Sequence, residues 1–340
     1  MAQTTPKGTI TVLSIAHESG TKLSMSSALC RIIKTAKIQQ QLRTTKIEEA
    51  IDFGKVHKHI INRISYIAAS KKCIASKLEP LQFMLTCPRQ FELELRDWAS
   101  FGQRALTAAR AQDCHGLFRE TEVFTPAGTS FANCDSVTFR VYHSKDAQSE
   151  RMNTEAKRPN HAKQVGLFSS EVTIRRPPSH PSAPPFFDIF DTYRKMTSNR
   201  VGVQKVTAAL KGRSDTFTPV YIGPTYSKAH ADKWVLTETI SKRTLKLLQK
   251  SGAVASDSPL KSTHIRHTSL SMVYLWYNNI PARAAAMSEI LSRSRHSMDT
   301  FLSSYHTRLP AQVVEAVGKY RYDSNKSSAL AVEELLTICT

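Results

Sequence analysis

A proline-rich passage limits the fold of this chain more strongly than any other stretch of its sequence. Residues 175–185 read Arg-Arg-Pro-Pro-Ser-His-Pro-Ser-Ala-Pro-Pro, which places five prolines among eleven residues. Proline fixes its own φ and lacks a backbone N–H, so the passage can continue neither a helix nor a central strand. We expect an extended, largely polyproline-like segment that forms a proline-rich insertion within a larger domain.

Helical periodicity dominates the rest of the chain. Residues 51–72 carry one apolar stripe, made of Ile60, Ile61, Ile64, Ile67 and Ala68. We expect His57 to lie largely off this stripe, together with the basic residues of the segment. Further helical signals cover residues 26–41, 90–112, 187–196, 239–251, 267–276, 281–292 and 299–305.

Alternation of apolar and polar side chains predicts two strands. In residues 135–142, Val137, Phe139 and Val141 alternate with polar neighbours, and residues 171–174 form a second candidate. The polar residues 144–164 between them suit an exposed loop or hairpin tip. The expected fold class is therefore mainly α with a small β component (α+β).

Breaks in the pattern suggest a domain organisation. Helical periodicity stops near residues 76–88, at Lys77-Leu-Glu-Pro80 and Thr86-Cys-Pro88. This predicts a helical domain over residues 1–80 and a mixed domain over residues 88–310. Residues 311–340 predict a tail helix, which could dock on a neighbouring subunit or on its own domain.

The charge of the chain indicates a polyanionic partner. Lys and Arg number 47 against 28 Asp and Glu, for a formal charge of +19 and a pI near 9.8. Arg63, Lys71 and Lys72 form a basic face that could follow a phosphate backbone, although a solvated helix face is the ordinary alternative. Charge alone fits a ribosomal or other RNA-binding protein as well as a DNA enzyme.

The six cysteines point away from a structural metal. They occur at positions 30, 73, 87, 114, 134 and 339, without a C-x-x-C pair or zinc-finger spacing. The first residues lack the order of a signal peptide, and no run approaches the ~20 apolar residues of a membrane span. We expect a soluble intracellular protein with free thiols, nuclear if eukaryotic and otherwise cytoplasmic.

The carboxy-terminal third carries the strongest motif. Thr263-His-Ile-Arg-His-Thr268 is followed thirty residues after Arg266 by His296, and nine residues later by Tyr305. This order and spacing resemble the second and third boxes of the tyrosine recombinase family. Upstream, Gly116-Leu-Phe-Arg-Glu-Thr-Glu-Val123 resembles the first box, with Arg119 and Glu122 in its Arg and Glu places.

The resemblance covers about residues 88–310. The strand ending at Tyr142 and running into His143-Ser-Lys145 resembles the β-hairpin that carries the family's lysine. The similarity is greater to recombinases of eukaryotic mobile elements (Crypton and DIRS-type) than to bacterial Xer proteins. It implies a helical core-binding domain and a mixed catalytic domain that form a C-shaped clamp around a duplex.

The resemblance also implies a reaction. Tyr305 would attack a DNA phosphodiester and form a 3′-phosphotyrosyl link, while Arg119 and Arg266 hold the phosphate oxygens. Lys145 would protonate the leaving oxygen, with His296 and His264 near the reacting groups, Arg295 as an added cation and Glu122 in a structural role. The reaction needs no cofactor or metal. Its partner is double-stranded DNA, and exchange between two duplexes implies a homotetramer.

Two departures keep other interpretations open. Thr263 stands where the family usually has histidine, so His264 or His267 would have to replace it, or activity is lost. Arg295 stands where glycine commonly precedes the third-box histidine. The alternatives are a catalytically inactive or domesticated DNA-binding derivative, a type IB topoisomerase-like enzyme, and a basic RNA-binding protein with an accidental motif.

Overall fold

The computed structural model describes residues 50–141, 170–198, 200, 202–203, 205–210, 213–227, 229–278, 309–320, 323, 325 and 327–338. Contacts divide the chain into residues 1–48 and residues 49–340, so every described residue belongs to the second unit. The division falls near residue 48, whereas the prolines suggested residues 76–88. Pro80 and Pro88 each occupy the start of a new helix, where the missing N–H is not needed.

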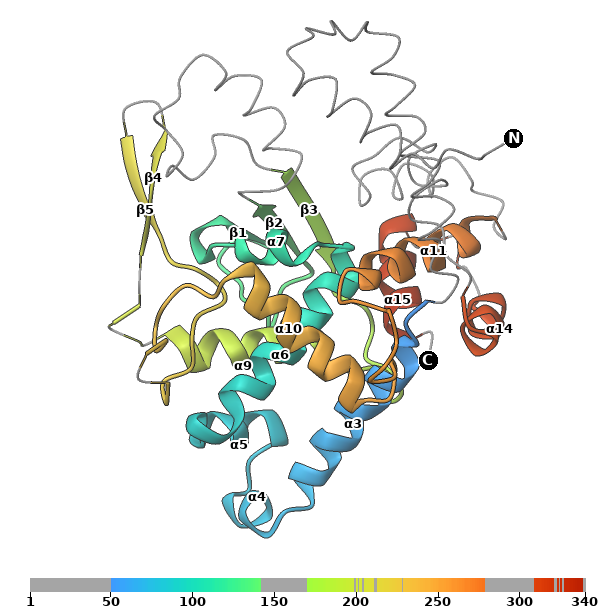
Figure 1. The fold of residues 1–340 in the computed structure, drawn as a ribbon, viewed down its shortest axis with the longest axis horizontal. Coiled ribbons are helices and arrows are strands. Elements are labelled where there is room, and N and C mark those ends of the chain that lie inside the picture. Colours follow the sequence, from blue (N-terminus) through green and yellow to red (C-terminus); the bar gives the residue numbers. More distant parts are fainter. Residues whose placement is uncertain are drawn as a thin grey trace, which may run out of the picture. The chain divides into compact units, whose positions relative to one another are not determined.

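Four helices lead into the centre of this unit (Figure 1). Helix α3 (Phe53–Ala68) begins at Asp52, whose side chain accepts a hydrogen bond from the Lys55 N–H. The predicted helix over residues 51–72 is two helices, because Ser70 caps a separate α4 (Lys71–Ser76). Helix α5 (Pro80–Thr86) then precedes α6 (Pro88–Thr107).

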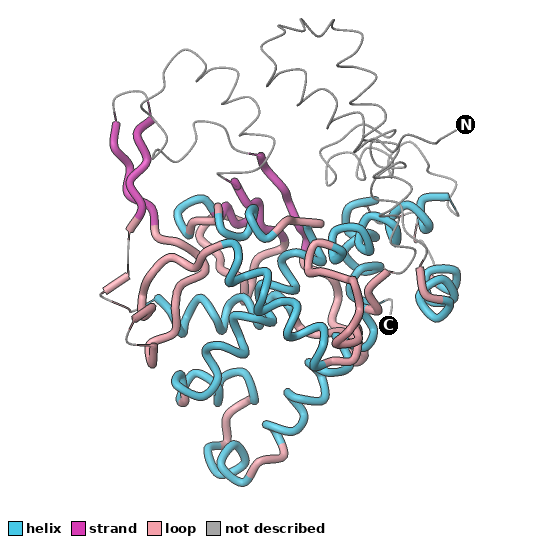
Figure 2. The backbone as a smooth tube through the Cα atoms, in the orientation of Figure 1, coloured by secondary structure: helices cyan, strands magenta, loops and turns pink. Residues whose placement is uncertain are grey.

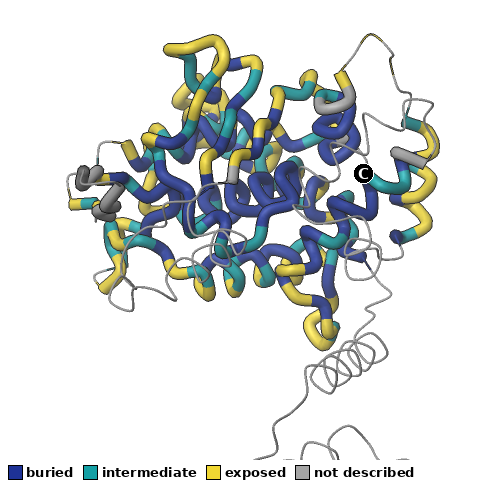
Figure 3. The backbone as a smooth tube through the Cα atoms, turned by 90° about the horizontal axis from the view of Figure 1, so that it is seen from above, coloured by how far each residue is buried: buried dark blue, intermediate teal, exposed yellow. Residues whose placement is uncertain are grey.

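Helix α6 lies at the core of the unit, and Figure 3 shows that backbone in the middle of the unit is buried. Leu95, Trp98 and Phe101 are almost completely buried. Gly102 lets helix α9 (Phe186–Ser198) approach closely, since a Cβ there would lie 2.3 Å from Cδ1 of Phe186. The helix ends where Ala108 adopts a left-handed conformation, and a short α7 (Ala111–His115) follows.

Three antiparallel strands form a small sheet in the order β1-β2-β3, drawn in magenta in Figure 2. A 3-10 turn, η1 (Arg119–Thr121), leads into β1 (Glu122–Thr125), which pairs with β2 (Ser136–Val141). Strand β2 pairs in turn with β3 (Ser170–Arg175). Val137, Phe139 and Val141 are buried, so the alternation that predicted β2 is confirmed.

A second, two-stranded sheet was not predicted. Strands β4 (Val206–Leu210) and β5 (Arg213–Phe217) pair antiparallel with each other. Helix α10 (Thr237–Lys250) and helix α11 (His264–Asn278) follow and confirm the helices predicted there. The described residues are thus mainly helical with a small antiparallel sheet, as expected. Helices predicted over residues 26–41, 281–292 and 299–305 lie outside the described residues.

The carboxy-terminal helices pack on the same unit. Helix α14 (Ala311–Lys319) contacts α11, and α15 (Ser328–Ile338) contacts α11, α6 and β3. Ala331, Val332 and Leu335 are fully buried. The tail helix was expected to dock either on a neighbouring subunit or on its own domain, and in this structure it packs on its own domain.

Arg175, the first residue of the proline-rich passage, still belongs to β3, and residues 176–185 then join β3 to α9 without helix or strand, as their composition predicted. It includes one turn, in which the Ala183 N–H donates to the His180 carbonyl at 3.0 Å. Among the residues placed by the structure, no helix is both long enough and apolar enough to cross a membrane.

Candidate functional site

The sequence-predicted site is only partly visible. Lys145 falls in residues 142–169, and Arg295, His296 and Tyr305 fall in residues 279–308, all outside the described residues. Arg119, Glu122, His264 and Arg266 are described. The structure therefore shows which of these four residues meet, and what surrounds them.

Arg266 is held against the end of helix α6. It lies in the first turn of α11 and is only 1% exposed. Its Nη1 donates a hydrogen bond of 2.7 Å to the carbonyl of Ala108, the residue that ends α6. The carbonyls at a helix end lack partners within the helix and carry partial negative charge, so a buried guanidinium is stabilised there.

A second buried arginine lies at the same place. Arg104, in the last turn of α6, is 0% exposed, and its Nη2 donates to the Ser262 carbonyl at 2.5 Å. Its Nε donates to the Ala109 carbonyl at 3.4 Å. We call Arg104, Ala108, Ala109, Ser262 and Arg266 the α6–α11 junction. Each arginine of the junction reaches across to the other helix or to the segment just before it.

Arg104 retains an unused hydrogen-bond donor. Its Nη1 is buried and has no hydrogen-bond partner in the described part of the chain. Burial lowers the pKa of Arg104, although Cys114, Asp113 and Tyr221 act in the opposite direction. A buried guanidinium with one N–H left without a hydrogen-bond partner suits an anion such as a phosphate oxygen.

Two histidines flank Arg266. Nδ1 of His264 accepts the Lys261 N–H at 2.8 Å, and its ring centroid is 5.2 Å from that of His267. Burial lowers the pKa of His264, and it lowers that of His267 to about 4, with His264, Arg266 and Arg110 adding to the effect. Both rings are therefore neutral near pH 7 and have a nitrogen that can take a proton, which the exposed hydroxyl of Thr263 does not, but the lowered pKa makes each a weaker base than an exposed histidine.

Arg119 has its contacts in a different place. It lies in η1, and its Nη2 donates to Oγ1 of Thr197 at 2.6 Å and to the Thr197 carbonyl at 3.1 Å. Burial lowers the pKa of Arg119, and the neighbouring Arg194 adds to the shift. The contacts of Arg119 thus lead to helix α9, while those of Arg266 lead to the end of α6.

Glu122 forms a buried ion pair with Arg194 of α9. Arg194 Nη2 lies 2.5 Å from Oε1 of Glu122, and the two side chains are 12% and 4% exposed. Burial by itself would lower the pKa of Arg194, but the Glu122 carboxylate outweighs it and raises that pKa. The pair ties the first strand of the sheet to α9, a structural arrangement.

Replacing Glu122 by Gln is expected to lower the free energy of unfolding by about 3–5 kcal/mol, because Arg194 would remain buried without its counter-charge. Urea denaturation would measure the loss. The matched control is Glu171→Gln, which breaks a 2.7 Å pair with Arg140 whose side chains are 51% and 47% exposed. That change should cost less than about 1 kcal/mol. Equal losses in the two variants would contradict the structural role of Glu122.

The segment that carries Lys145 starts and ends close to the junction. Val141 and Ser170 are paired neighbours, so residues 142–169 leave and rejoin the sheet at one end. A small cavity at this end is lined by Val141 and Val172 together with Gln103 and Thr107, which flank Arg104 on α6. The attachment points of this segment therefore lie beside the last turn of α6.

The candidate DNA-binding residues of the amino-terminal helices differ in their surroundings. Arg63 pairs with Glu94 at 2.9 Å, so part of its charge is neutralised within the protein. Lys71 and Lys72 are exposed in the first turn of α4. Arg63 also lines a groove between α3, α6 and α10, to which Arg243, Lys246 and Lys250 contribute further cations.

Sequence reasoning missed Arg104. Arg119 was chosen because Glu122 follows it by three residues, whereas the residue at the same distance from Arg104 is Thr107. A signal was nevertheless present, since Arg104 is the only charged residue in residues 99–109. An isolated charge within an apolar helical run is expensive to bury and is frequently retained for a specific contact.

Comparison with protein-family models, with curated proteins and with solved structures gives no match for this chain. Within the described ranges, no cluster of three or more His, Cys, Asp or Glu side chains could hold a metal ion. What the site does must therefore be argued from its own residues.

Proposed function

We propose that this protein cleaves and rejoins DNA strands through a 3′-phosphotyrosyl intermediate, with Tyr305 as nucleophile. The observation that carries the proposal is the α6–α11 junction, to which Arg104 and Arg266 both belong and in which Nη1 of Arg104 is buried without a hydrogen-bond partner among the described residues. We assign the two phosphate-holding arginines to Arg104 and Arg266 in place of Arg119.

The chemistry uses the side chains around this junction. The phenol oxygen of Tyr305 attacks phosphorus, the bond to the 5′ oxygen breaks, and that oxygen leaves as a hydroxyl after taking a proton from Lys145. Guanidinium groups neutralise charge on the non-bridging oxygens as it builds. A 5′ hydroxyl later attacks the phosphotyrosyl link, which restores the diester and frees Tyr305. No cofactor takes part in either step.

The histidines supply proton acceptors. A tyrosine phenol has a pKa of about 10 and is mostly protonated near neutrality, so attack requires loss of its proton. His267 and His264 lie next to Arg266 in the sequence and are neutral because burial lowers the pKa of each. In the proposal they, together with His296, replace the histidine that is absent at Thr263.

Other parts of the proposal follow from charge and stoichiometry. A charge of +19 favours duplex DNA as partner, bound with steep salt dependence. Exchange between two duplexes requires four nucleophiles and hence a homotetramer on DNA. The protein would act where its DNA is held, in the nucleus if the source is eukaryotic.

Covalent trapping tests the proposal. The full chain is incubated with a pool of nicked duplexes of randomised sequence, in which the short fragment bearing the 5′ hydroxyl diffuses away after cleavage. We expect a protein–DNA adduct that resists denaturation and disappears in Tyr305→Phe. Tyr66→Phe, at a side chain that is 69% exposed, serves as control and should keep the adduct. No adduct from any duplex, or an adduct that survives Tyr305→Phe, would overturn the proposal.

One observation favours a second function, DNA binding without catalysis. Arg104 and Arg266 are 0% and 1% exposed, so a phosphate reaches them only if the surrounding segments move. If both arginines only brace helix ends, the chain would bind duplex DNA with the same salt dependence and form no adduct. Equal affinities of the native chain and Tyr305→Phe, with no trapping, identify this case.

A further inference from the structure

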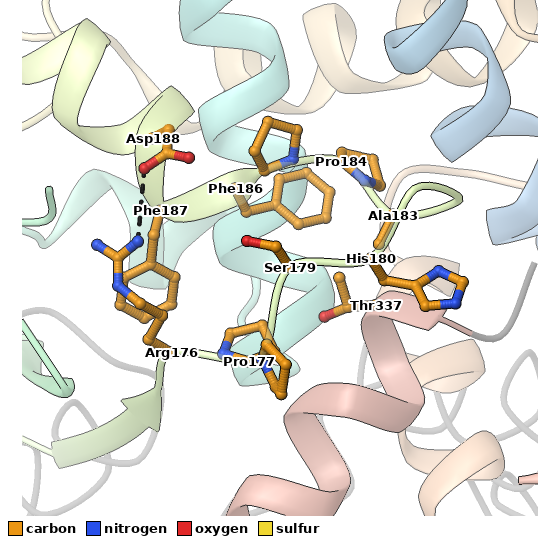
Figure 4. A pocket seen from close by; sticks show the side chains of 12 residues that line it. Arg176, Pro177, Ser179, His180, Ala183, Pro184, Phe186, Phe187, Asp188 and Thr337 are labelled. Atoms are coloured by element: carbon orange, nitrogen blue, oxygen red, sulfur yellow. Dashed lines mark hydrogen bonds and ion pairs between the residues drawn. The ribbon is translucent and has the colours of Figure 1, made fainter.

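The proline-rich passage, residues 175–185, is fixed at both ends. At its start, the Arg176 N–H donates to the Asp135 carbonyl at 2.8 Å, and its Nε donates to the Cys134 carbonyl at 3.1 Å. Arg176 also pairs with Asp188 of α9, as Figure 4 shows. At its other end, Pro184 is buried next to Phe186. The passage is therefore attached firmly to the sheet and to α9.

The middle of the passage is exposed. Residues 178–182 are all exposed, although they lie between the half-buried Arg176 and the buried Pro184. Proline fixes φ near −65°, so such a segment is already close to the polyproline II conformation before any partner binds. The turn from His180 to Ala183 has Pro181 and Ser182 at its centre, so the extended part of the exposed run is residues 178–180.

Charge and proline recur with a period of three. Arg175 ends β3 and Pro181 opens the turn, and the residues between them are in neither helix nor strand, so a polyproline II repeat of three residues per turn over this stretch brings Arg175, Pro178 and Pro181 to one edge. All three residues are exposed. The side chain of Arg175 also donates to the Ser327 hydroxyl, a contact at the surface that a stronger partner can replace. The exposed edge therefore reads Arg-x-x-Pro-x-x-Pro.

We propose that this edge binds a proline-recognition domain of the SH3 type. Such a domain presents an aromatic-lined groove that takes the rings of Pro178 and Pro181, and an acidic pocket that takes the guanidinium of Arg175. A segment that is fixed at both ends loses little conformational entropy on binding, and here the fold already holds residues 178–182 exposed. This surface is separate from the α6–α11 junction, so the interaction does not depend on the proposed cleavage activity.

DNA is the competing partner, because Arg175 and Arg176 add to an already basic chain. Of the exposed edge, however, only Arg175 is charged, and contacts between proline rings and aromatic side chains are not screened by salt. Binding through the proline edge should persist at 300 mM salt, at which the Debye length is about 6 Å and non-specific attraction to an acidic domain is weak. Salt therefore separates the two modes.

The test titrates the full chain against a purified SH3 domain that selects Arg-x-x-Pro-x-x-Pro ligands, following the fluorescence of its groove tryptophan at 300 mM salt. Pro178→Ala and Pro181→Ala should each weaken binding about tenfold or more, and Arg175→Gln should also weaken it. Pro185→Ala, at an exposed proline beyond the seven-residue edge, should leave affinity unchanged.

Three results would overturn the proposal. The first is no binding by the full chain, even if a synthetic peptide of residues 173–183 binds, because the edge is then inaccessible in the folded protein. The second is equal affinity of the native chain, Pro178→Ala and Pro181→Ala. The third is a signal that vanishes at 300 mM salt or is displaced by duplex DNA, which assigns the surface to nucleic acid. Unchanged thermal unfolding of the variants confirms that each is folded, since the replaced side chains are exposed.

Discussion

Replacing Arg104 by Lys is expected to slow covalent adduct formation by about 10²–10³-fold, while Arg119→Lys should change the rate by no more than a few-fold. Lysine keeps the charge but lacks the planar guanidinium group. At Arg104, Nη2 of this group donates to the Ser262 carbonyl, and Nη1 remains available for a phosphate oxygen. At Arg119 the same change alters only contacts with Thr197. The measurement is a single-turnover rate on the trapped duplex.

Controls separate chemistry from folding in this comparison. Arg266→Lys should resemble Arg104→Lys, because both arginines belong to the α6–α11 junction. Circular dichroism and DNA affinity report whether each variant is folded and binds. If Arg104→Lys does not fold, the variant Arg266→Ala with added guanidinium ion at low concentration provides a second test, because the truncated side chain leaves space for the ion, which should restore the rate without changing DNA affinity. A larger loss of rate in Arg119→Lys than in the two junction variants would show that Arg119, and not Arg104, is one of the phosphate-holding arginines.

A second large effect is expected at low pH. His57 is completely buried, and burial lowers its pKa to about 3, against a small opposing effect of the Thr337 carbonyl. Its ring lies among Phe53, Phe101 and Phe186, with centroid separations of 5.6 to 6.2 Å. The neutral form is the one that the folded protein accepts.

The sign of the pH dependence follows from this lowered pKa. Above pH 6.5, His57 is neutral in both the folded and the unfolded chain and adds no pH dependence. As pH falls from 6.5 towards 3, only the unfolded chain binds the proton, so the free energy of unfolding decreases by about 1.4 kcal/mol per pH unit, roughly 5 kcal/mol in total. His267 adds a similar decrease in the free energy of unfolding per pH unit, down to its pKa of about 4.

Urea denaturation between pH 7 and pH 4 tests this expectation. In His57→Phe, the free energy of unfolding should fall less steeply with decreasing pH, by the amount that corresponds to about one proton. The reason is that an apolar ring suits the surrounding phenylalanines and cannot titrate. His180→Gln, at an exposed side chain, is the control and should leave the slope unchanged. A slope that is the same in His57→Phe and in the native chain would show that His57 is not the group responsible.

The fold was predictable where the local pattern and the packing agree. The alternation in β2 and the helices α9, α10 and α11 were found because each element buries the face that its sequence marks as apolar. His57 was placed wrongly, since its position on α3 belongs to the face formed by Phe53, Val56 and Ile60. A basic-looking residue was read as solvent-facing, although aromatic rings from α6 and α9 enclose it.

The site was less predictable for two physical reasons. Arg104 lies in the last turn of α6 and reaches the junction that includes Arg266 only because α6 and α11 pack together, and no local spacing encodes that packing. Arg119 satisfied the expected spacing to Glu122, but the fold directs it to Thr197 and directs Glu122 to Arg194. Spacing alone predicted that Arg266 lies next to His264 and His267, because these residues share one turn of a single helix.

The docking of α15 has a consequence for the order of events during synthesis. Thr337, near the carboxyl end, meets His57 of α3, and the backbone N–H of Ile51 donates to Thr268 of α11 at 2.9 Å. The first described helix thus depends on residues made more than two hundred positions later. While the ribosome is still adding these residues, the apolar faces of α3 and α6 are not yet covered, and the nascent chain is prone to aggregation. Synthesis of α15, rather than of any earlier helix, is the step that closes this core.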